Sequence, residues 1–246
     1  MAVLAKNSEN RLLANMPPGA FTALAPFLQP ISLKPRQRLE FSNRPVETAI
    51  FLERGLASVV LTGMWPRRKA AEIAVIGREG MTGLALALGF DRSSYDVIIQ
   101  VEGRGLGIAA DELRRAMAQS PALSAWLKRY AYTFTLQVGC TALANAHGTI
   151  EERLARSLLM AQDRTDGPDL PLTHELLALM LGVRRAGVTI ALHQLVTYGL
   201  IAIARGTITI LDRNGLELSA HGLYGTPESS FTCTVPGIRH EPESGH

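Results

Sequence analysis

One stretch near the middle of the chain limits the fold more than any other. Residues 131–150 contain no Asp, Glu, Lys or Arg, although they continue a helix that we predict over residues 122–146. A surface helix normally has a charged face, so this helix is expected to be covered on more than one side. Polar residues such as Thr133 and Gln137 dot its length, and no apolar run reaches the roughly 18–20 residues of a membrane span.

The same helix has a seam in which residues recur at alternating steps of four and three, as in a coiled coil. One interpretation is a dimer helix that packs on its two-fold mate and on its own preceding domain. The other is an ordinary buried helix of a monomer, and periodicity alone does not separate the two. The predicted dimer-interface residues are Leu127, Ala131, Phe134, Val138, Thr141 and Asn145.

The residues before this helix have a different texture. Between residues 31 and 108, short apolar runs are separated by glycines such as Gly55, Gly77 and Gly103. Frequent short strands with glycine between them are typical of an all-β barrel or roll.

The residues after the helix contain a compact pattern in residues 172–211. Thr173 is a candidate N-cap for a short apolar helix, and Gly182 can supply the left-handed residue of a tight turn. A second helix is predicted from Arg185 to Tyr198, followed by two short strands around residues 204–207. Helix, turn, helix and a two-stranded hairpin together predict a winged helix-turn-helix.

The second helix of such a motif lies in the major groove of DNA, with an apolar back and a polar front. Arg185, near its start, can donate two hydrogen bonds to guanine. Arg184 and Arg205, with nearby threonines, are suited to phosphate oxygens. The candidate DNA-contacting residues are Thr173, Arg184, Arg185, Thr189, His193, Arg205, Gly206 and Thr207. Between residues 184 and 213, four arginines face a single acid, so the basic charge is local.

Composition and motifs exclude several other classes. Apolar residues make up 47% of the chain and charged residues 19%, which is globular composition. The first residues lack the apolar core of a secretory signal, and Cys140 and Cys233 form neither a disulfide framework nor a metal spacing. We therefore expect a cytoplasmic protein without a membrane partner. No nucleophile elbow, phosphate-binding loop or His-Glu metal motif is present, so we do not expect an enzyme.

On these features the chain resembles the Crp/Fnr family of bacterial transcription regulators over roughly residues 20–215. The resemblance is most specific over residues 152–159 (ERLARSLL), 173–182 and 199–211. It implies an α+β chain with a cyclic-nucleotide-binding-like β-roll (residues 1–121), a dimerisation helix (122–147) and a winged helix-turn-helix DNA-binding domain (148–225). Residues 226–246, rich in Pro, Ser and Gly, are expected to be a disordered tail.

The resemblance also implies partners. A homodimer would bind a pseudo-palindromic site in double-stranded DNA, with its two recognition helices about 34 Å apart. RNA polymerase is a further candidate partner. One departure concerns base specificity, because the family often has Glu and Arg where this chain has Ala186 and Ile190.

A second departure concerns the effector. Cyclic-nucleotide binders of the family use a Gly-Glu for the ribose and an Arg-Ser for the phosphate. Here Arg78 stands where that Glu is expected, and the Arg-Ser follows a longer loop, so we do not favour cyclic-nucleotide binding. The residues of this candidate effector pocket are Arg78, Glu79, Arg92, Ser93 and Ser94.

No cofactor or metal is predicted. The oxygen-sensing members hold an iron–sulfur cluster with N-terminal cysteines, and residues 1–50 contain none. The six histidines have no ligand-like spacing. The alternative function is a ligand-responsive regulatory module that acts on a protein partner, with a degenerate helix-turn-helix that lacks the usual Glu and Arg.

Overall fold

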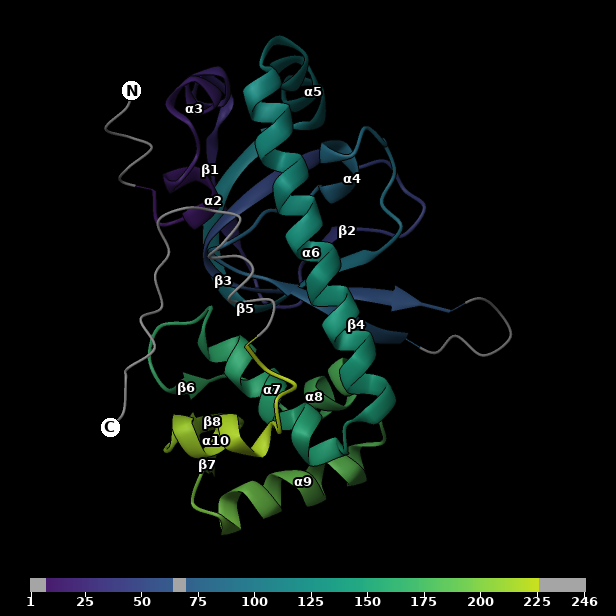
Figure 1. The fold of residues 1–246 in the computed structure, drawn as a ribbon, viewed down its shortest axis with the longest axis vertical. Coiled ribbons are helices and arrows are strands. Elements are labelled where there is room, and N and C mark those ends of the chain that lie inside the picture. The colour runs from purple at the N-terminus through teal and green to yellow at the C-terminus, as the bar shows by residue number, and fades with distance from the viewer. Residues whose placement is uncertain (1–7, 64–69, 226–246) are drawn as a thin grey trace.

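The computed structural model describes residues 8–63 and 70–225. The predicted disordered tail, with Cys233, lies outside the described residues. The chain is a mixed α+β fold in which an antiparallel sheet is followed by a long helix and a helical C-terminal part (Figure 1). The predicted fold class is thereby confirmed.

An antiparallel β-roll forms the N-terminal part. Its strands pair in the order β1-β5-β3-β4, and β2 pairs with β5. The bounds are β1 Gln29–Leu33, β2 Arg38–Glu40, β3 Thr48–Thr62, β4 Ala70–Ile76 and β5 Asp96–Ala109. The two long strands bend where their register shifts, between Leu52 and Ala57 of β3. At this bend a Cβ on Gly103 would stand 2.0 Å from the carbonyl oxygen of Arg54, so only glycine allows the strands to approach.

Short helices close one end of the roll. They are α2 (Arg11–Ala14), α3 (Pro18–Leu24), the 3₁₀ turn η1 (Ala25–Phe27), α4 (Leu84–Ala87) and α5 (Ala110–Gln119). They share a core with the sheet in which Phe51, Met81 and Leu113 are fully buried.

Helix α6 (Pro121–His147) runs the length of the molecule, from α5 at one end to the C-terminal helices at the other (Figure 1). The Ser120 side chain caps its start by accepting a hydrogen bond from the Leu123 N–H. One face packs on the roll, where Tyr130 and Phe134 are buried. The Gln137 side chain accepts a hydrogen bond of 2.6 Å from the N–H of Val75, which ties α6 to β4.

The C-terminal part begins at Thr149, which forms a capping box with Glu152. Its helices and strands are α7 (Ile150–Gln162), β6 (Asp169–Leu170), α8 (His174–Leu181), α9 (Arg185–Thr197), β7 (Ile201–Ala204), β8 (Thr207–Ile210) and α10 (Arg213–Ser219). The three short strands pair in the order β6-β8-β7. Helix α8 packs on β4, and Leu56 and Val75 of the roll join the C-terminal core. The two parts of the chain therefore share buried surface.

Within the described residues, no single helix is long and apolar enough to cross a membrane. Helices α8 and α9 pass that test only when taken together, and they meet at a bend of 108°.

Candidate nucleic-acid interface

Helices α8 and α9 form a helix-turn-helix. The Thr173 hydroxyl accepts a hydrogen bond of 3.2 Å from the Leu176 N–H and so caps α8. Gly182 ends α8 with a φ of 63°, the left-handed value that the turn requires. The bend of 108° between the helices lies in the range of about 90–120° that DNA-binding helix-turn-helix units use. The predicted turn residue and the predicted N-cap of α8 both occupy these positions.

Helix α9 has one buried and one open face. Val188, Leu192 and Leu195 are fully buried against the rest of the C-terminal core. With about 100° of rotation per residue, the direction opposite to them is occupied by four exposed residues. These are Ala186, Ile190, His193 and Thr197. We call this set the open face of α9. In Figure 1, α9 lies at the outer end of the molecule, away from the roll.

Arg185 and Thr189 flank the open face. Arg185 pairs with Glu175 at 3.1 Å, and both side chains are about two-thirds exposed, at 66% and 63%. Such an exposed pair contributes little to stability and can exchange for a DNA contact. Thr189 is half-buried, and its hydroxyl contacts His174 Nδ1 at 3.1 Å and the Arg185 carbonyl oxygen at 3.1 Å. Thr189 therefore links α8 to α9, in addition to the DNA contact that the sequence predicts for it.

The wing is the hairpin of β7 and β8. Arg205 and Gly206 at its tip both have positive φ, at 47° and 81°. Two successive residues of this kind form the tight turn that suits the twist of a hairpin. Both residues are exposed, and Thr207 behind them is half-buried. The wing thus presents one free-standing arginine at its tip.

Not every arginine of this region is available to DNA. Arg184 is exposed at the start of α9 and does not cap it with its side chain. Arg213 instead pairs with Asp163 at 2.9 Å and with Glu217 at 3.0 Å. Arg213 is one of the four arginines that make residues 184–213 basic, but these two ion pairs neutralise its guanidinium within the domain. The basic side chains open to a ligand here are those of Arg184, Arg185 and Arg205.

The predicted effector pocket is divided between two sets of contacts. Arg78 donates hydrogen bonds to the Thr165 carbonyl oxygen at 2.9 Å and to Asp166 at 3.0 Å. Glu79 pairs with Arg164 at 2.7 Å, and the two side chains are only 14% and 6% exposed. Both residues of the roll are therefore bound to the loop that follows α7.

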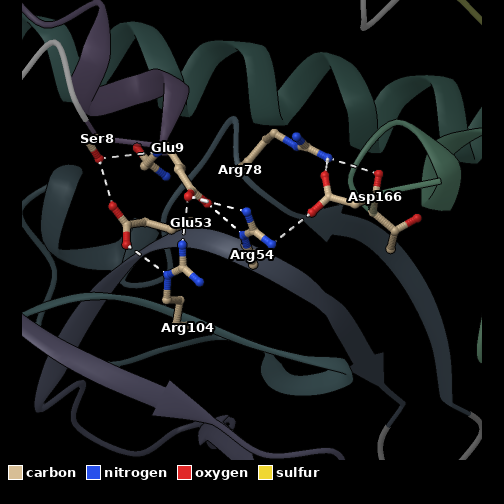
Figure 2. Close-up of polar contacts among 9 residues, drawn as sticks. Ser8, Glu9, Glu53, Arg54, Arg78, Arg104 and Asp166 are labelled. Atoms are coloured by element: carbon tan, nitrogen blue, oxygen red, sulfur yellow. Dashed lines mark hydrogen bonds and ion pairs between the residues drawn. The ribbon is translucent and has the colours of Figure 1, made fainter.

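The contact between Arg78 and Asp166 belongs to a larger network of charges (Figure 2). Arg54 of β3 pairs with Asp166 at 3.4 Å and with Glu9 at 2.8 Å, and Glu9 also pairs with Arg104 at 2.7 Å. Hydrogen bonding by Arg54 lowers the pKa of Glu9 below its usual value. The network joins the start of the chain, the roll and the C-terminal part.

The other half of the predicted pocket has different partners. Arg92 is exposed and donates to the Asn43 carbonyl oxygen at 2.8 Å. Ser93 is buried and donates to the Tyr95 carbonyl oxygen at 2.9 Å, while Ser94 is exposed. Among the described residues, no hydrogen bond or ion pair joins these three residues to Arg78 or Glu79. The interior of the roll is filled by apolar side chains, among them Phe134 of α6.

The predicted dimer seam of α6 is turned inward over much of its length. Leu127, Ala131 and Phe134 are buried inside the chain, at 5% exposure or less. Val138 and Thr141 are half-buried, and Asn145 is exposed. These three residues are already buried within their own chain, which leaves little of their surface for the predicted dimer contact.

The opposite face of α6 is exposed and apolar. Tyr132 is 60% exposed and Leu143 is 54% exposed. Between and beyond them lie other uncharged residues, namely Thr135, Leu136, Gly139, Ala142 and Ala146. We call this set the outer stripe of α6, and it belongs to the charge-free residues 131–150. The periodicity of the sequence did not predict it as a separate face, because the inward seam has the more regular spacing.

A small cavity of about 20 Å³ lies where β4, α6, α7 and α8 meet. It has room for about one water molecule. Burial raises the pKa of Glu72, on its wall, to about 7, although a hydrogen bond from Ser58 and the charges of Arg156 and Arg164 oppose the rise. Arg153, also on the wall, donates to the Leu181 carbonyl oxygen at the end of α8, and its Nε is buried without a hydrogen-bond partner. The described residues contain no group of three metal-ligating side chains.

Comparisons with known proteins agree with this geometry. Residues 152–218 match the family model described as the Crp-like helix-turn-helix domain. FixK2 from Bradyrhizobium japonicum is similar in structure, with a TM-score of 0.67 and 17% identity, covering 80% of this chain and 98% of that one. No curated protein matches the sequence.

Two further solved structures are similar. A transcriptional regulator of the crp/fnr family from Eubacterium rectale has a TM-score of 0.66 and 19% identity, covering 86% of this chain and 98% of that one. The c-di-GMP responsive regulator CLP from Xanthomonas campestris has a TM-score of 0.62 and 15% identity, covering 78% and 98%. At these identities the similarity shows a shared fold.

Fold and interface together define a winged helix-turn-helix that follows a β-roll and a long helix. Residues 152–218 thus match the Crp-like helix-turn-helix domain, and the chain as a whole shares the fold of solved Crp/Fnr-type regulators.

Proposed function

We propose that the chain binds a pseudo-palindromic site in double-stranded DNA as a homodimer, with α9 in the major groove. The observation that carries this proposal is the open face of α9, which is flanked by Arg184 and Arg185 and backed by a fully buried core. Arg185 is the base-contacting residue, because its exposed guanidinium near the helix start can donate two hydrogen bonds to guanine. Arg184 and Arg205 bind phosphates, and His193 lies on the open face where it meets base edges.

The dimer forms through the outer stripe of α6. Its exposed, uncharged side chains, from Tyr132 to Ala146, can be buried on a two-fold mate without removing a charge from water. The proposed domain division follows: a roll to residue 121, the dimerisation helix over 122–147 and the DNA-binding domain over 148–225. A DNA-binding role puts the protein in the cytoplasm, and RNA polymerase is a proposed partner. Catalysis is no part of the proposal.

Arg78 and Glu79 act in this proposal as a coupling between the roll and the DNA-binding domain. Their contacts with Arg164, Thr165 and Asp166 support this role more than they support an effector site. CLP is described as c-di-GMP responsive, but in this chain the residues that would meet a cyclic nucleotide are engaged elsewhere. We propose no cofactor, and the alternative of a module that acts only on a protein partner is not favoured.

The test is binding to duplexes selected from a random-sequence pool, measured by gel shift. Arg185→Ala is expected to weaken the best duplex by about 1–3 kcal/mol and to relax the preference at one base pair of each half-site. Arg205→Ala is expected to weaken all duplexes similarly and to reduce the salt slope by about one.

The matched control is Arg115→Ala. Arg115 is 65% exposed, like Arg185, but it lies on α5 in the N-terminal part. The control removes the same charge and is expected to leave DNA binding unchanged. Equal loss in all three variants would mean that only net charge matters, and the docking of α9 would then be wrong.

A further inference from the structure

The centre of the open face of α9 is apolar in its N-terminal half. Ala186 and Ile190 are one helical turn apart, and both are exposed. Ile190 keeps 64% of its surface in contact with water. Single exposed apolar residues are common on proteins and need no function. What distinguishes Ile190 is its position, because recognition helices touch base edges with the residues of this half.

The groove itself restricts what an isoleucine can face. Among the four bases, only thymine presents an apolar group in the major groove, its C5-methyl. Guanine, adenine and cytosine present acceptors or donors at the corresponding edge. An isoleucine against such an edge would displace water without replacing its hydrogen bonds, which is unfavourable. Against a thymine methyl, the same side chain buries apolar surface at no such cost.

The flanking residues fit this arrangement. Ala186 has only a methyl group, so it lets the backbone of α9 approach the base edges closely at the position before Ile190. Arg185 lies beside the apolar pair and not among it, since it flanks the open face. A guanine contact and a thymine contact can therefore be made from neighbouring positions of one helix.

We propose that Ile190, supported by Ala186, recognises the C5-methyl group of a thymine in each half-site. The proposal rests on the proposed function, because it requires α9 to enter the major groove. It adds a specificity residue that replaces polar base contacts with an apolar one. The loss of Glu and Arg at these positions is then a change of the base recognised and not a degeneration of the motif.

The experiment uses the full chain and the best duplex recovered from the random-sequence pool. Each thymine of that duplex is replaced in turn by uracil, which pairs identically but lacks the methyl group. Burial of one methyl contributes about 0.8 kcal/mol, so uracil at the contacted position should weaken wild-type binding about fourfold in each half-site. Replacing a cytosine by 5-methylcytosine elsewhere should have no such effect.

The variants assign the effect to the side chain. Ile190→Ala should bind the thymine and uracil duplexes equally, whereas Ile190→Val, which keeps two methyl groups, should retain most of the preference. Leu218→Ala is the matched control, because Leu218 is an aliphatic residue with 77% exposure on α10. It should bind as the wild type does. Since both leucine and isoleucine are exposed, neither substitution removes a core contact.

The outcomes separate the two proposals. If the wild type selects a sequence but no uracil substitution changes its affinity, the inference about Ile190 is wrong and the proposed function stands. The same conclusion follows if Ile190→Ala keeps the thymine preference. Failure to bind any duplex in the pool would overturn the proposed function, and this inference with it.

Discussion

Glu79→Gln tests the coupling between the roll and the DNA-binding domain. Gln has the same shape as Glu but no charge, so the change removes the carboxylate charge that Glu79 places beside the buried Arg164 guanidinium. The two side chains are 14% and 6% exposed and lie 2.7 Å apart. Removing one partner of a buried ion pair typically costs about 3–5 kcal/mol, because the other charge stays out of water.

The contacts of Arg164 decide where in this range the loss should fall. Its Nη1 also donates to the Met160 carbonyl oxygen at 2.8 Å, a bond that the variant keeps. The amide oxygen of Gln can still accept from Arg164 and from the Gly77 N–H, which Glu79 now does at 3.2 Å. We therefore expect the low end, a loss of about 3 kcal/mol in the free energy of unfolding.

The assay is urea unfolding followed by circular dichroism, at low and at high salt. Arg54→Gln is the control, because Arg54 also pairs with the loop that follows α7, through Asp166, but is 51% exposed. It should cost less than Glu79→Gln, and its effect should shrink as salt is added, whereas the effect of Glu79→Gln should persist. The double variant Glu79→Leu with Arg164→Met should recover much of the stability, since a buried pair can be replaced by apolar residues. A loss below about 1 kcal/mol for Glu79→Gln would refute the reasoning.

Three further predictions concern the junction, the dimer and the core. Burial raises the pKa of Glu72 to about 7, above the ordinary 4.5 of the unfolded state, so the free energy of unfolding should fall as pH rises between these values. Glu72→Gln should abolish this fall. Since Glu72 is partly exposed, the variant should add roughly 1–2 kcal/mol at pH 8 in urea unfolding. Leu143→Glu should convert the proposed dimer to a monomer in light scattering, while Leu218→Glu, equally charged and also exposed, should not. Phe134→Ala should lower the free energy of unfolding by about 3–5 kcal/mol, because it leaves a cavity in the apolar interior of the roll.

The parts of the structure that depend on local chemistry could be predicted from the sequence. Gly182 marks the turn because only glycine adopts its backbone conformation cheaply, and Thr173 marks the start of α8 by its hydroxyl. The glycines of residues 31–108 predicted a roll, and Gly103 shows why, since β3 and β5 meet there too closely for a side chain. Such signals lie within a few residues of what they determine.

Contacts between distant residues could not be predicted in this way. Arg78 and Asp166 are separated by 88 positions, and nothing in either neighbourhood indicates the other. The sequence therefore predicts a role for Arg78 only through the family's nucleotide pocket, and it does not predict the contact with Asp166. Likewise, the polar residues of α9 were chosen by residue type, whereas the open face is set by the direction of the buried core. The sequence shows that Ile190 replaces the family's usual Arg, but only the packed domain shows that Ile190 lies at the centre of the open face of α9.

Helix α6 shows most clearly how far the sequence can predict contacts between distant parts. It has two apolar stripes, one that packs on the roll and one that we assign to the proposed dimer. The inward stripe meets a bent sheet and must be filled by large side chains such as Phe134, which gives it a regular, recognisable spacing. The outer stripe, with Gly139 between Tyr132 and Leu143, needs only to match its own copy in the dimer that we propose. Small residues suffice where two helix backbones approach closely. For the proposed dimer face, the lack of charge over residues 131–150 is therefore a better indicator than the periodicity, since charge must be absent on every side that loses contact with water.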